Sequence, residues 1–587
     1  MKLKRFIALL LAFALCLFAF GCEVIPSEAD KSNLGTQVDV SGADEEQIHI
    51  RDKSLLYEMY EATEVVTMYL TVSVGNAAEN TNHTWEEINT YSAYDYESWG
   101  VPRYQVAGLL QVGNEEGLVE GELGYGQVAP NCTVQIRGQS SSLNVQKNYK
   151  IKIKENKGSW RGQTTIALNK HQGDGLRFRN KLGFDLLSGV EELMSLRTTF
   201  VHLYVKDTTA GGEAKFEDYG LYTQVEQLNK TALETHGLDK RGHLYKINVC
   251  EFYRYEDVIR MKDDPLYDVT AFEQILEIKG DDDHSKLIAL LEKINDYSIP
   301  METILEEHFD MENIAYWMAF QLMLGNVDTQ SRNFYLYSPL NSDRWYILAW
   351  DLDGMLKRSE WEIQERYDYA EWERGISNYW GNILFRRCLK SEAYLAALDA
   401  AVEDLRGYLS AERVEALTEA YAEVVKPYLY TGRDLLYAPL TAKEYDTVLA
   451  SVMTMIEDNY RFYKESFDNP MPFFIVAPKK AEGGRISLEW DTSYDLDAEA
   501  ITYTVEVANE YTFASPIFKA EGLRLPMAEI DGLAAGQYFI RVRATNESGN
   551  SQYAFDTYTT EQGKVYGTMC FYVDAKGDIV EDVYVEG

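Results

Sequence analysis

Residues 326–354 constrain the fold more than any other stretch of the 587-residue chain, because they combine polar oxygens with apolar, strand-like runs. Two runs rich in aromatic and branched residues, 334–337 and 345–350, are typical of β-strands. Four side chains with carboxylate or amide oxygens precede the first run or follow the second: Asp328, Asn333, Asp351 and Asp353. Mg²⁺ prefers few, well-placed ligands of this kind. The stretch therefore predicts a metal site beside two strands.

The spacing of these side chains matches the order used in phosphoryl transfer. There an Asp handles the hydroxyl proton, an Asn after four intervening residues holds one metal ion, and a later Asp holds the other. Asp328, Asn333 and Asp351 follow this order. The alternative is that Asp328 and Asn333 form turns between a helix and a strand, a common role of both residue types. On this segment alone, the turn-forming alternative is favoured.

The N-terminus is typical of an exported protein. Residues 2–5 carry three cations, and residues 6–20 are apolar but too few to span a bilayer comfortably. We predict a signal peptide over residues 1–21. Its ending resembles a bacterial lipoprotein cleavage box, although Ala19 stands where Leu is usual; Cys22 would then be lipidated, and residues 22–60 would form a flexible linker. Ordinary secretion is the alternative.

The net charge of −38 limits the partners that the chain can bind. Such a charge argues against nucleic acid and against electrostatic docking on anionic lipid. The only membrane association that we expect is therefore through the N-terminal lipid, with the protein facing the outside of the cell.

A strand, a small-residue turn and a second strand are predicted over residues 133–154. In the second strand, three lysines share one face and three apolar residues the other: Lys150, Lys152 and Lys154 against Tyr149, Ile151 and Ile153. A turn of small residues at 137–142 would let backbone N–H groups approach phosphates. The alternative, favoured for this segment alone, is a solvated lysine face beside a serine-rich turn.

The character of the sequence changes twice along the chain. Strand-like patterns dominate before about residue 252, with short strands and loops expected over 75–130 and a helix over 176–190. Helical patterns follow, among them 311–324 with Asp310 as its N-cap. After a break at 469–472, the pattern alternates as in antiparallel strands. With Trp490 and the motif around Tyr538, residues 472–575 resemble an all-β fibronectin type III sandwich.

Four ordered segments of the chain match one known family. They are the turn and lysine strand at 137–152, the Arg-Asn-Lys-Leu helix at 179–182, the Gly-Leu-Tyr-x₃-Glu strand at 220–226, and the Asp-x₄-Asn stretch followed by Trp-Asp-Leu-Asp, at 328–353. On these motifs the chain resembles the CotH (spore coat protein H) kinase-like family over about residues 65–465. Gln139 and Met355 depart from the residues usual in that family. Four motifs in order favour the kinase-like interpretation over the turn-forming one.

The resemblance implies an α+β, two-lobed, atypical protein-kinase-like fold over residues 61–468. The strand-rich N-lobe would cover about 61–250 and the helical C-lobe about 251–468, with ATP and Mg²⁺ or Mn²⁺ as cofactors. Asp328 would orient or deprotonate the acceptor, Lys152 would pair with phosphate with Lys150 as its substitute, and the metal ligands would be Asn333, Asp351 and Asp353. The residues implied around the nucleotide, some with a packing or surface role as the alternative, are Arg137, Gly138, Ser140, Lys150, Arg179, Glu226 and Trp345.

The implied function is transfer of the γ-phosphate of ATP to Ser or Thr of surface or secreted proteins, by an exported, lipid-anchored kinase whose acceptor is unknown. Two alternatives stay open. One is a catalytically inactive kinase-like scaffold that binds a polysaccharide or a protein partner at the cell surface. The other is transfer of AMP in place of phosphate.

Overall fold

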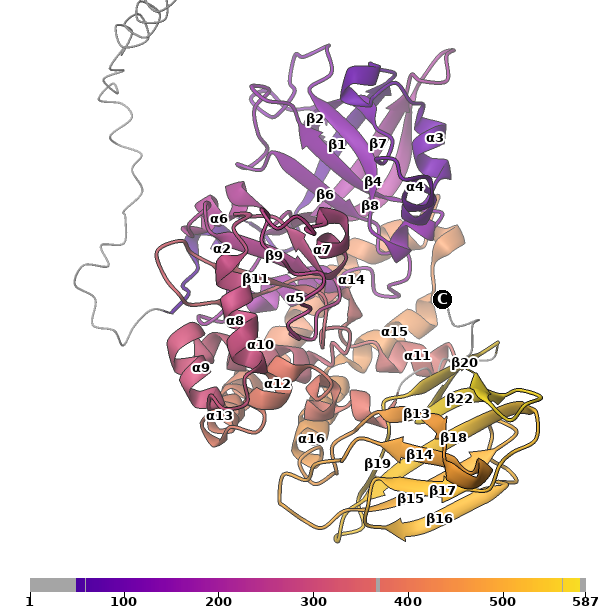
Figure 1. Cartoon of the computed structure of the whole chain (residues 1–587). Coiled ribbons are helices and arrows are strands. Elements are labelled where there is room, and N and C mark those ends of the chain that lie inside the picture. Colours follow the sequence, from indigo (N-terminus) through magenta and orange to yellow (C-terminus); the bar gives the residue numbers. More distant parts are fainter. Residues whose placement is uncertain (1–48, 59, 366–369, 562, 581–587) are drawn as a thin grey trace, which may run out of the picture. The chain divides into compact units, whose positions relative to one another are not determined.

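The computed structural model describes residues 49–580 except 59, 366–369 and 562 (Figure 1). The predicted signal peptide, Cys22 and most of the predicted linker lie outside the described residues. Within the described ranges, no helix is both long and apolar enough to cross a bilayer.

An eight-stranded sheet forms the first part of the described chain. Its strand order is β1-β7-β8-β6-β5-β4-β2-β3, and β1 also pairs with β2, so the hydrogen-bonded strands close into a ring. Apolar side chains from its strands and from two short helices pack into one cluster. The strands are β1 (Val65–Ser73), β2 (Val106–Asn114), β3 (Gly117–Leu118), β4 (Cys132–Arg137), β5 (Asn148–Ile153), β6 (Thr165–Asn169), β7 (Thr198–Asp207) and β8 (Phe216–Glu226).

The alternation predicted for β5 is present in the structure. Tyr149, Ile151 and Ile153 are buried, whereas Lys150 is half-buried and Lys152 exposed. Because side chains alternate across a strand, burial of the apolar face leaves both lysines on the other face.

Two helices lie within residues 75–130, where only short strands and loops were expected. Helix α3 (Trp85–Thr90) begins with a capping box of Thr84 and Glu87, and α4 (Ala93–Trp99) with one of Ser92 and Asp95. In a capping box, the side chains of the cap and of the third residue satisfy each other's backbone N–H groups. These helices have fewer than two turns, so their apolar period is too short to detect, but the caps mark where they begin.

A four-stranded antiparallel sheet connects the strand-rich part to the helical part. Its order is β10-β9-β11-β12, and every residue of β11 and β12 is buried. Its strands are β9 (His243–Ile247), β10 (Leu276–Ile278), β11 (Phe334–Ser338) and β12 (Tyr346–Ala349). The two strand-like runs of residues 326–354 are thus β11 and β12, and they form one hairpin.

Helix α10 (Met311–Leu324) lies at the centre of the helical part and packs against β12, α13 and α16. Asp310 caps its start by accepting from the backbone N–H of Asn313, as predicted, and Gly325 ends it with a left-handed φ of 60°. The other helices are α2 (Leu55–Glu58), α5 (Arg179–Leu187), α6 (Lys230–His236), α7 (Val269–Ile275), α8 (Ser285–Asn295), α9 (Met301–His308), α11 (Arg358–Ile363), α12 (Ile383–Cys388), α13 (Glu392–Tyr408), α14 (Ala411–Leu429), α15 (Ala442–Ala450) and α16 (Val452–Glu465).

Among the described residues from 475 onward, the C-terminal region consists of strands, turns and the short 3₁₀ element η8 (Glu482–Gly484). Sheets of order β13-β14-β17 and β16-β15-β18-β22-β23 share one apolar cluster that includes Trp490. The side-chain O–H of Tyr538 donates to the carbonyl of Ala534 at 3.0 Å. The strands are β13 (Ile475–Lys480), β14 (Ile486–Trp490), β15 (Thr502–Ala508), β16 (Phe518–Leu523), β17 (Met527–Ile530), β18 (Gly536–Thr545), β19 (Ser551–Tyr553), β20 (Thr557–Thr560), β21 (Gly563–Tyr566), β22 (Thr568–Val573) and β23 (Ile579–Val580).

Candidate active site

The β11–β12 hairpin brings the polar residues of the 326–354 stretch to one end. Phe334 pairs with Ala349. Asn333, which precedes β11, and Asp351, which follows β12, therefore lie at the same end of the hairpin. Both have left-handed backbone conformations, with φ of 61° for Asn333 and 57° for Asp351. Non-glycine residues rarely adopt such φ values, and the strain they carry tends to gather at functional sites.

Asp328 and Asn333 are bound to each other. The Asn333 Nδ2 donates to the Asp328 carbonyl at 2.9 Å and to its carboxylate Oδ2 at 3.0 Å. The Asp328 side chain is 58% exposed, and Arg332 Nε lies 3.7 Å from its Oδ1. Partial loss of solvent and the nearby charge of Asp353 raise the pKa of Asp328, although Arg332 and Asn333 oppose this. Asp328 is therefore an accessible carboxylate with an increased affinity for a proton.

Asp351 and Asp353 form a pair of like charges. Burial and the charge of Asp353 raise the pKa of Asp351 to about 7, against the opposing effect of Arg137. Burial also opposes the charge of Asp353. The hydrogen bond from His171 and the charge of His171 outweigh burial, so the pKa of Asp353 is lowered. The Nδ1 of His171 lies 3.3 Å from Asp353 Oδ2. A cation beside the pair would relieve this repulsion.

These side chains fit a Mg²⁺ site of the open kind. In the part of the chain that the structure describes, no group of three or more His, Cys, Asp or Glu is arranged to hold a metal ion without other ligands. A divalent ion would therefore be held by Asp351 and Asp353, by the amide oxygen of Asn333 and by water. Mg²⁺ keeps several waters and needs only one or two protein carboxylates.

Arg137 and Lys246 act electrostatically on Asp351, and Lys150 lies within the electrostatic reach of Arg137. Arg137 ends β4, Lys150 lies in β5 and Lys246 in β9. The Arg137 guanidinium is 5.9 Å from the ring centroid of Trp350, the residue before Asp351. The strand-rich part therefore meets the end of the hairpin at this point.

Burial opposes the positive charges of two lysines in this cluster. Burial and repulsion from Lys279 lower the pKa of Lys150, and burial also lowers that of Lys246. Glu277 is 4.0 Å from Lys246 Nζ. Within the described residues, no hydrogen bond or ion pair reaches the Lys150 side chain. An anion bound between these cations would favour their charged forms.

The family to which the chain belongs follows from a comparison of its sequence with family models. The model described as CotH kinase protein matches residues 134–463, which is more than half of the chain. The chain belongs to the CotH kinase family. The match covers the hairpin, the lysine strand and all the candidate residues described above. A search of curated proteins found no match.

The two lysines expected to contact phosphate in a CotH kinase have different positions. Lys150 lies within the electrostatic reach of Arg137 and Glu277, whereas Lys152 is exposed two residues further along β5. The structure therefore favours Lys150 as the lysine that faces the cluster. The expectation placed Lys152 first because sequence alternation assigns both lysines to one face and does not rank positions along it.

The glycine turn begins directly after Arg137. Gly138 has a φ of 89°, and a Cβ at this position would lie 2.0 Å from the Ser141 Oγ, so only glycine fits. Its carbonyl accepts from Arg103 at 2.9 Å. Ser140 is exposed and begins the short 3₁₀ turn η3 (Ser140–Leu143). Gly138 and Ser140 thus lie at the end of β4 that carries Arg137.

Arg179 does not lie where a nucleotide would contact it. Its side chain is fully buried and paired with Asp174 and Glu360, at 2.5 Å from the latter. Its Nε donates to the Leu356 carbonyl at 3.1 Å. Arg179 therefore fastens the segment after Gly354 to the core, and its predicted role in the nucleotide pocket is replaced by a packing role.

Trp345 is also a core residue. It is 1% exposed, its ring centroid lies 5.9 Å from that of His243, and Lys286 Nζ lies 5.5 Å from its centroid. Because the ring is almost fully buried among side chains of the chain itself, its position does not match the expected stacking on adenine. Trp345 directly precedes β12, in which every residue is buried.

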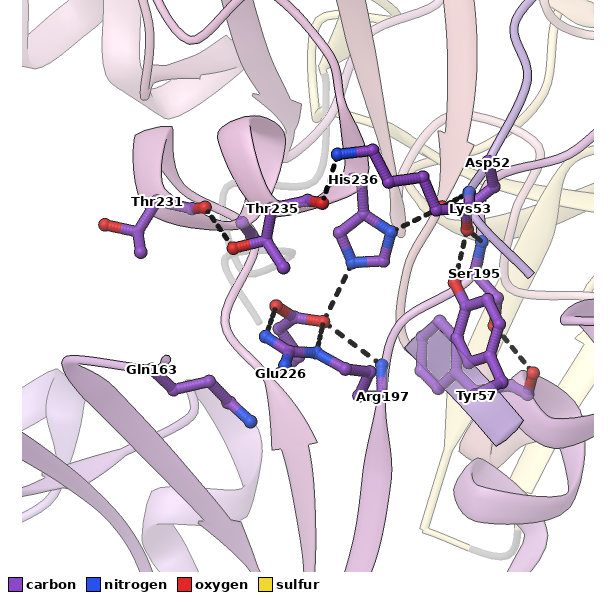
Figure 2. A network of polar contacts seen from close by, with 12 residues as sticks. Asp52, Lys53, Tyr57, Gln163, Ser195, Arg197, Glu226, Thr231, Thr235 and His236 are labelled. Carbon is purple, nitrogen blue, oxygen red and sulfur yellow. Dashed lines mark hydrogen bonds and ion pairs between the residues drawn. The ribbon is translucent and has the colours of Figure 1, made fainter. Parts of the chain in front are cut away.

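Glu226 ends β8 inside a buried polar network (Figure 2). Figure 2 shows its carboxylate facing Arg197, whose Nε is 2.9 Å away, and His236, whose Nε2 is 3.0 Å away. The other ring nitrogen of His236 contacts Asp52 at 2.6 Å. Glu226 is 1% exposed and so does not line a nucleotide pocket. Its predicted role is replaced by that of a buried ion-pair partner.

Two residues near the carboxylate pair were not predicted. His171 contacts Asp353, and Asn180 accepts from the backbone N–H of Leu352 at 3.1 Å. Asn180 Nδ2 also lies 3.5 Å from His171 Nε2. Asn180, from the Arg-Asn-Lys-Leu motif, thus orients the Asp351–Asp353 turn. The motif supported the family resemblance but did not indicate this role. His171 lies in a loop with no pattern that could have identified it.

Proposed function

We propose that this CotH family member transfers the γ-phosphate of ATP to Ser or Thr hydroxyls of surface or secreted proteins. The observation that carries the proposal is the contact between Arg137 and Trp350, which joins the cationic strands to the hairpin that presents Asp328, Asn333 and Asp351. The cations Arg137 and Lys150, beside the Asp351–Asp353 pair, suit a phosphate chain that carries a metal ion.

Each group has a distinct task in the proposed reaction. Lys150, with Arg137, would bind phosphate oxygens, and Asn333, Asp351 and Asp353 would hold Mg²⁺. The ion would neutralise charge on the phosphate oxygens. The accessible carboxylate of Asp328 would orient the acceptor hydroxyl and take its proton as the new O–P bond forms, while ADP leaves. Catalysis would then rest on positioning and charge neutralisation.

The chain is proposed to act outside the cell, anchored through a lipid on Cys22. This placement rests on the sequence of residues 1–22. The C-terminal region is proposed to be a fibronectin type III-like domain, supported by its two sheets, by Trp490 in their shared cluster, and by the Tyr538 hydrogen bond to a carbonyl four residues upstream.

Transfer of label from γ-³²P-ATP to generic acceptor proteins tests the proposed reaction. We expect incorporation by the wild-type protein with Mg²⁺ or Mn²⁺, and a loss of at least about 100-fold in Asp351→Ala, because a charged ligand of the metal is removed. Equal rates in the two proteins would contradict the site assignment. Label retained from α-³²P-ATP in place of γ-³²P-ATP would identify AMP transfer, and label from neither would leave the scaffold alternative.

A further inference from the structure

Residues 371–382 connect the candidate catalytic loop to the C-terminal all-β region. This segment, here called the connector, contains the 3₁₀ turns η5 (Glu371–Glu373) and η6 (Gly375–Tyr379) and ends at the N-cap of α12. One side of it is hydrogen-bonded to the loop that carries Asp328, and the other packs on aromatic side chains beyond residue 490.

The hydrogen bonds from the connector reach both neighbours of Asp328. The Asn378 Nδ2 donates to the Val327 carbonyl at 3.0 Å, and the Tyr379 hydroxyl lies 2.8 Å from the Thr329 Oγ1. In addition, the Asn382 Nδ2 donates to the carbonyl of Gln330 at 2.8 Å. Asn378, Tyr379 and Asn382 are almost fully buried, so these bonds are shielded from water. The backbone around Asp328 is therefore held by the connector and not only by the β11–β12 hairpin.

The opposite side of the connector carries two tryptophans that contact the all-β region. The Trp372 ring meets that of Phe555 edge-on with 5.0 Å between centroids, and Trp380 stacks on Tyr494 at 5.4 Å. A Cβ on Gly381 would lie 3.6 Å from the Phe555 ring, so the connector backbone itself approaches Phe555 closely. Aromatic pairs of this geometry stabilise a contact beyond the area that they bury.

A charge from the all-β region also acts on the catalytic carboxylate. Lys564, in β21, is among the cations that oppose the rise in the pKa of Asp328. The all-β region thus affects Asp328 both through the connector and directly.

We infer that the C-terminal all-β region positions the catalytic loop, with Trp372 and Phe555 as the contact that transmits its support and with Asn378 and Tyr379 as the positioning residues beside Asp328. These residues do not touch the reacting atoms in this scheme. They act by fixing the backbone on both sides of Asp328, because a small displacement of a reacting group lowers the rate of transfer steeply. The effect on transfer rests on the proposed function, whereas the effect on the loop itself does not.

Hydrogen exchange of the full chain, followed by mass spectrometry, tests the coupling without any assay of activity. We expect the amides of residues 326–333 to exchange at least about tenfold faster in Phe555→Ala and in Trp372→Ala than in the wild type, because loss of the contact lets the loop open. The double variant should exchange no faster than the faster single variant, because both substitutions remove one contact.

Tyr511→Ala is the matched control for these variants. Tyr511 is a half-buried aromatic of the same all-β region, and its ring contacts Phe539 and Tyr558 of that region. We expect it to leave exchange at 326–333 unchanged. Phe555→Tyr, which keeps the ring, should restore wild-type exchange. Wild-type exchange at 326–333 in both Phe555→Ala and Trp372→Ala, with faster exchange at 551–573, would overturn the inference.

The kinetic readout separates this inference from the proposed function. If the wild type transfers phosphate, Phe555→Ala should lower kcat about tenfold and leave the KM for ATP within about twofold, because the loop orients the acceptor and does not bind the nucleotide. A raised KM with unchanged kcat would contradict the inference. If the wild type transfers nothing, the proposed function fails, and the exchange measurement alone decides whether the all-β region supports the loop.

Discussion

The buried network around Glu226 and the charge cluster of Arg137, Lys150, Lys246, Asp351 and Asp353, here called the Asp351 cluster, contain the same kinds of side chain in opposite electrostatic states. In the network, Glu226 contacts Arg197 and His236, and His236 contacts Asp52 (Figure 2). Burial opposes these charges, but the partners lower the pKa of Glu226 to about 2 and raise that of His236 to about 9. Every charge is therefore compensated inside the chain.

In the Asp351 cluster, the same physical effects leave Asp351 and Lys150 without full compensation. Burial and Asp353 raise the pKa of Asp351 to about 7, and burial with nearby cations lowers that of Lys150. Both shifts favour the neutral form. The comparison teaches that burial alone does not tell the two kinds of charged residue apart. The direction of the pKa shift does: it favours the charged form in an ion pair that stabilises the fold and the neutral form in a site that lacks its ligand.

The largest effect that we expect concerns the closed network. Glu226→Gln leaves Arg197 buried without its anion and His236 with Asp52 alone, and should lower the free energy of unfolding by about 3–5 kcal/mol. Urea denaturation followed by fluorescence measures this change. Glu234→Gln is the matched control, since Glu234 is 60% exposed and pairs with Lys240 on the surface, and it should cost less than about 1 kcal/mol.

The pH dependence of the Glu226→Gln effect sharpens this prediction. The lowered pKa of Glu226 stabilises the fold above its unfolded value of about 4.3, and this contribution is lost as the pH falls toward 2. The raised pKa of His236 stabilises the fold below about 6.5, and this contribution is lost as the pH rises toward 9. The difference between wild type and variant should therefore be largest between about pH 4.5 and 6.5. A constant difference from pH 4 to 9 would contradict the assignment of the network.

The next effect separates the two lysines of β5. Lys150→Ala should weaken binding of Mg²⁺-ATP about 10- to 100-fold, the cost of losing one hydrogen bond to a charged group. Lys152→Ala is its matched control on the same face of the same strand, and should change the Kd less than about twofold because Lys152 is exposed. Calorimetric titration measures both. A larger loss in Lys152→Ala would restore the assignment made from sequence.

The smallest effect concerns the cost to folding stability of burying the Asp351 carboxylate. The raised pKa of Asp351 means that the folded state resists its ionisation, so the fold loses stability as the pH rises from about 4 to 7 and stays at the lower level above pH 7. In buffer with chelator, Asp351→Asn should raise Tm by a few degrees at pH 8, corresponding to about 1 kcal/mol, and by less at pH 4.5. A lower Tm for the variant at pH 8 would place Asp351 with the compensated charges.

The secondary structure of the site could be predicted from the sequence, because its signals are local. The alternation of β5, the apolar runs of β11 and β12, and the Asp310 cap of α10 each depend on neighbouring residues alone. The short helices α3 and α4 were missed because they span too few residues to show an apolar period, although each has a capping box.

The roles of individual charged residues could not be predicted in the same way. Glu226 binds a histidine that itself binds Asp52, which lies 184 positions earlier in the chain than that histidine. Arg179 likewise pairs with Glu360, 181 positions later. Such partners are set by the tertiary fold, so a sequence motif that contains a charged residue does not reveal whether its partner lies inside the protein.

Calorimetric titration of the wild-type chain with ATP, in the presence and absence of Mg²⁺, is the most direct test of the account. It measures whether the Asp351 cluster binds a metal-bound nucleotide. We predict binding of Mg²⁺-ATP with a Kd of about 1 mM or tighter, and clearly weaker binding when Mg²⁺ is removed by chelator. Folded protein that binds no nucleotide at millimolar concentration with Mg²⁺ present would contradict this account and would favour the scaffold alternative.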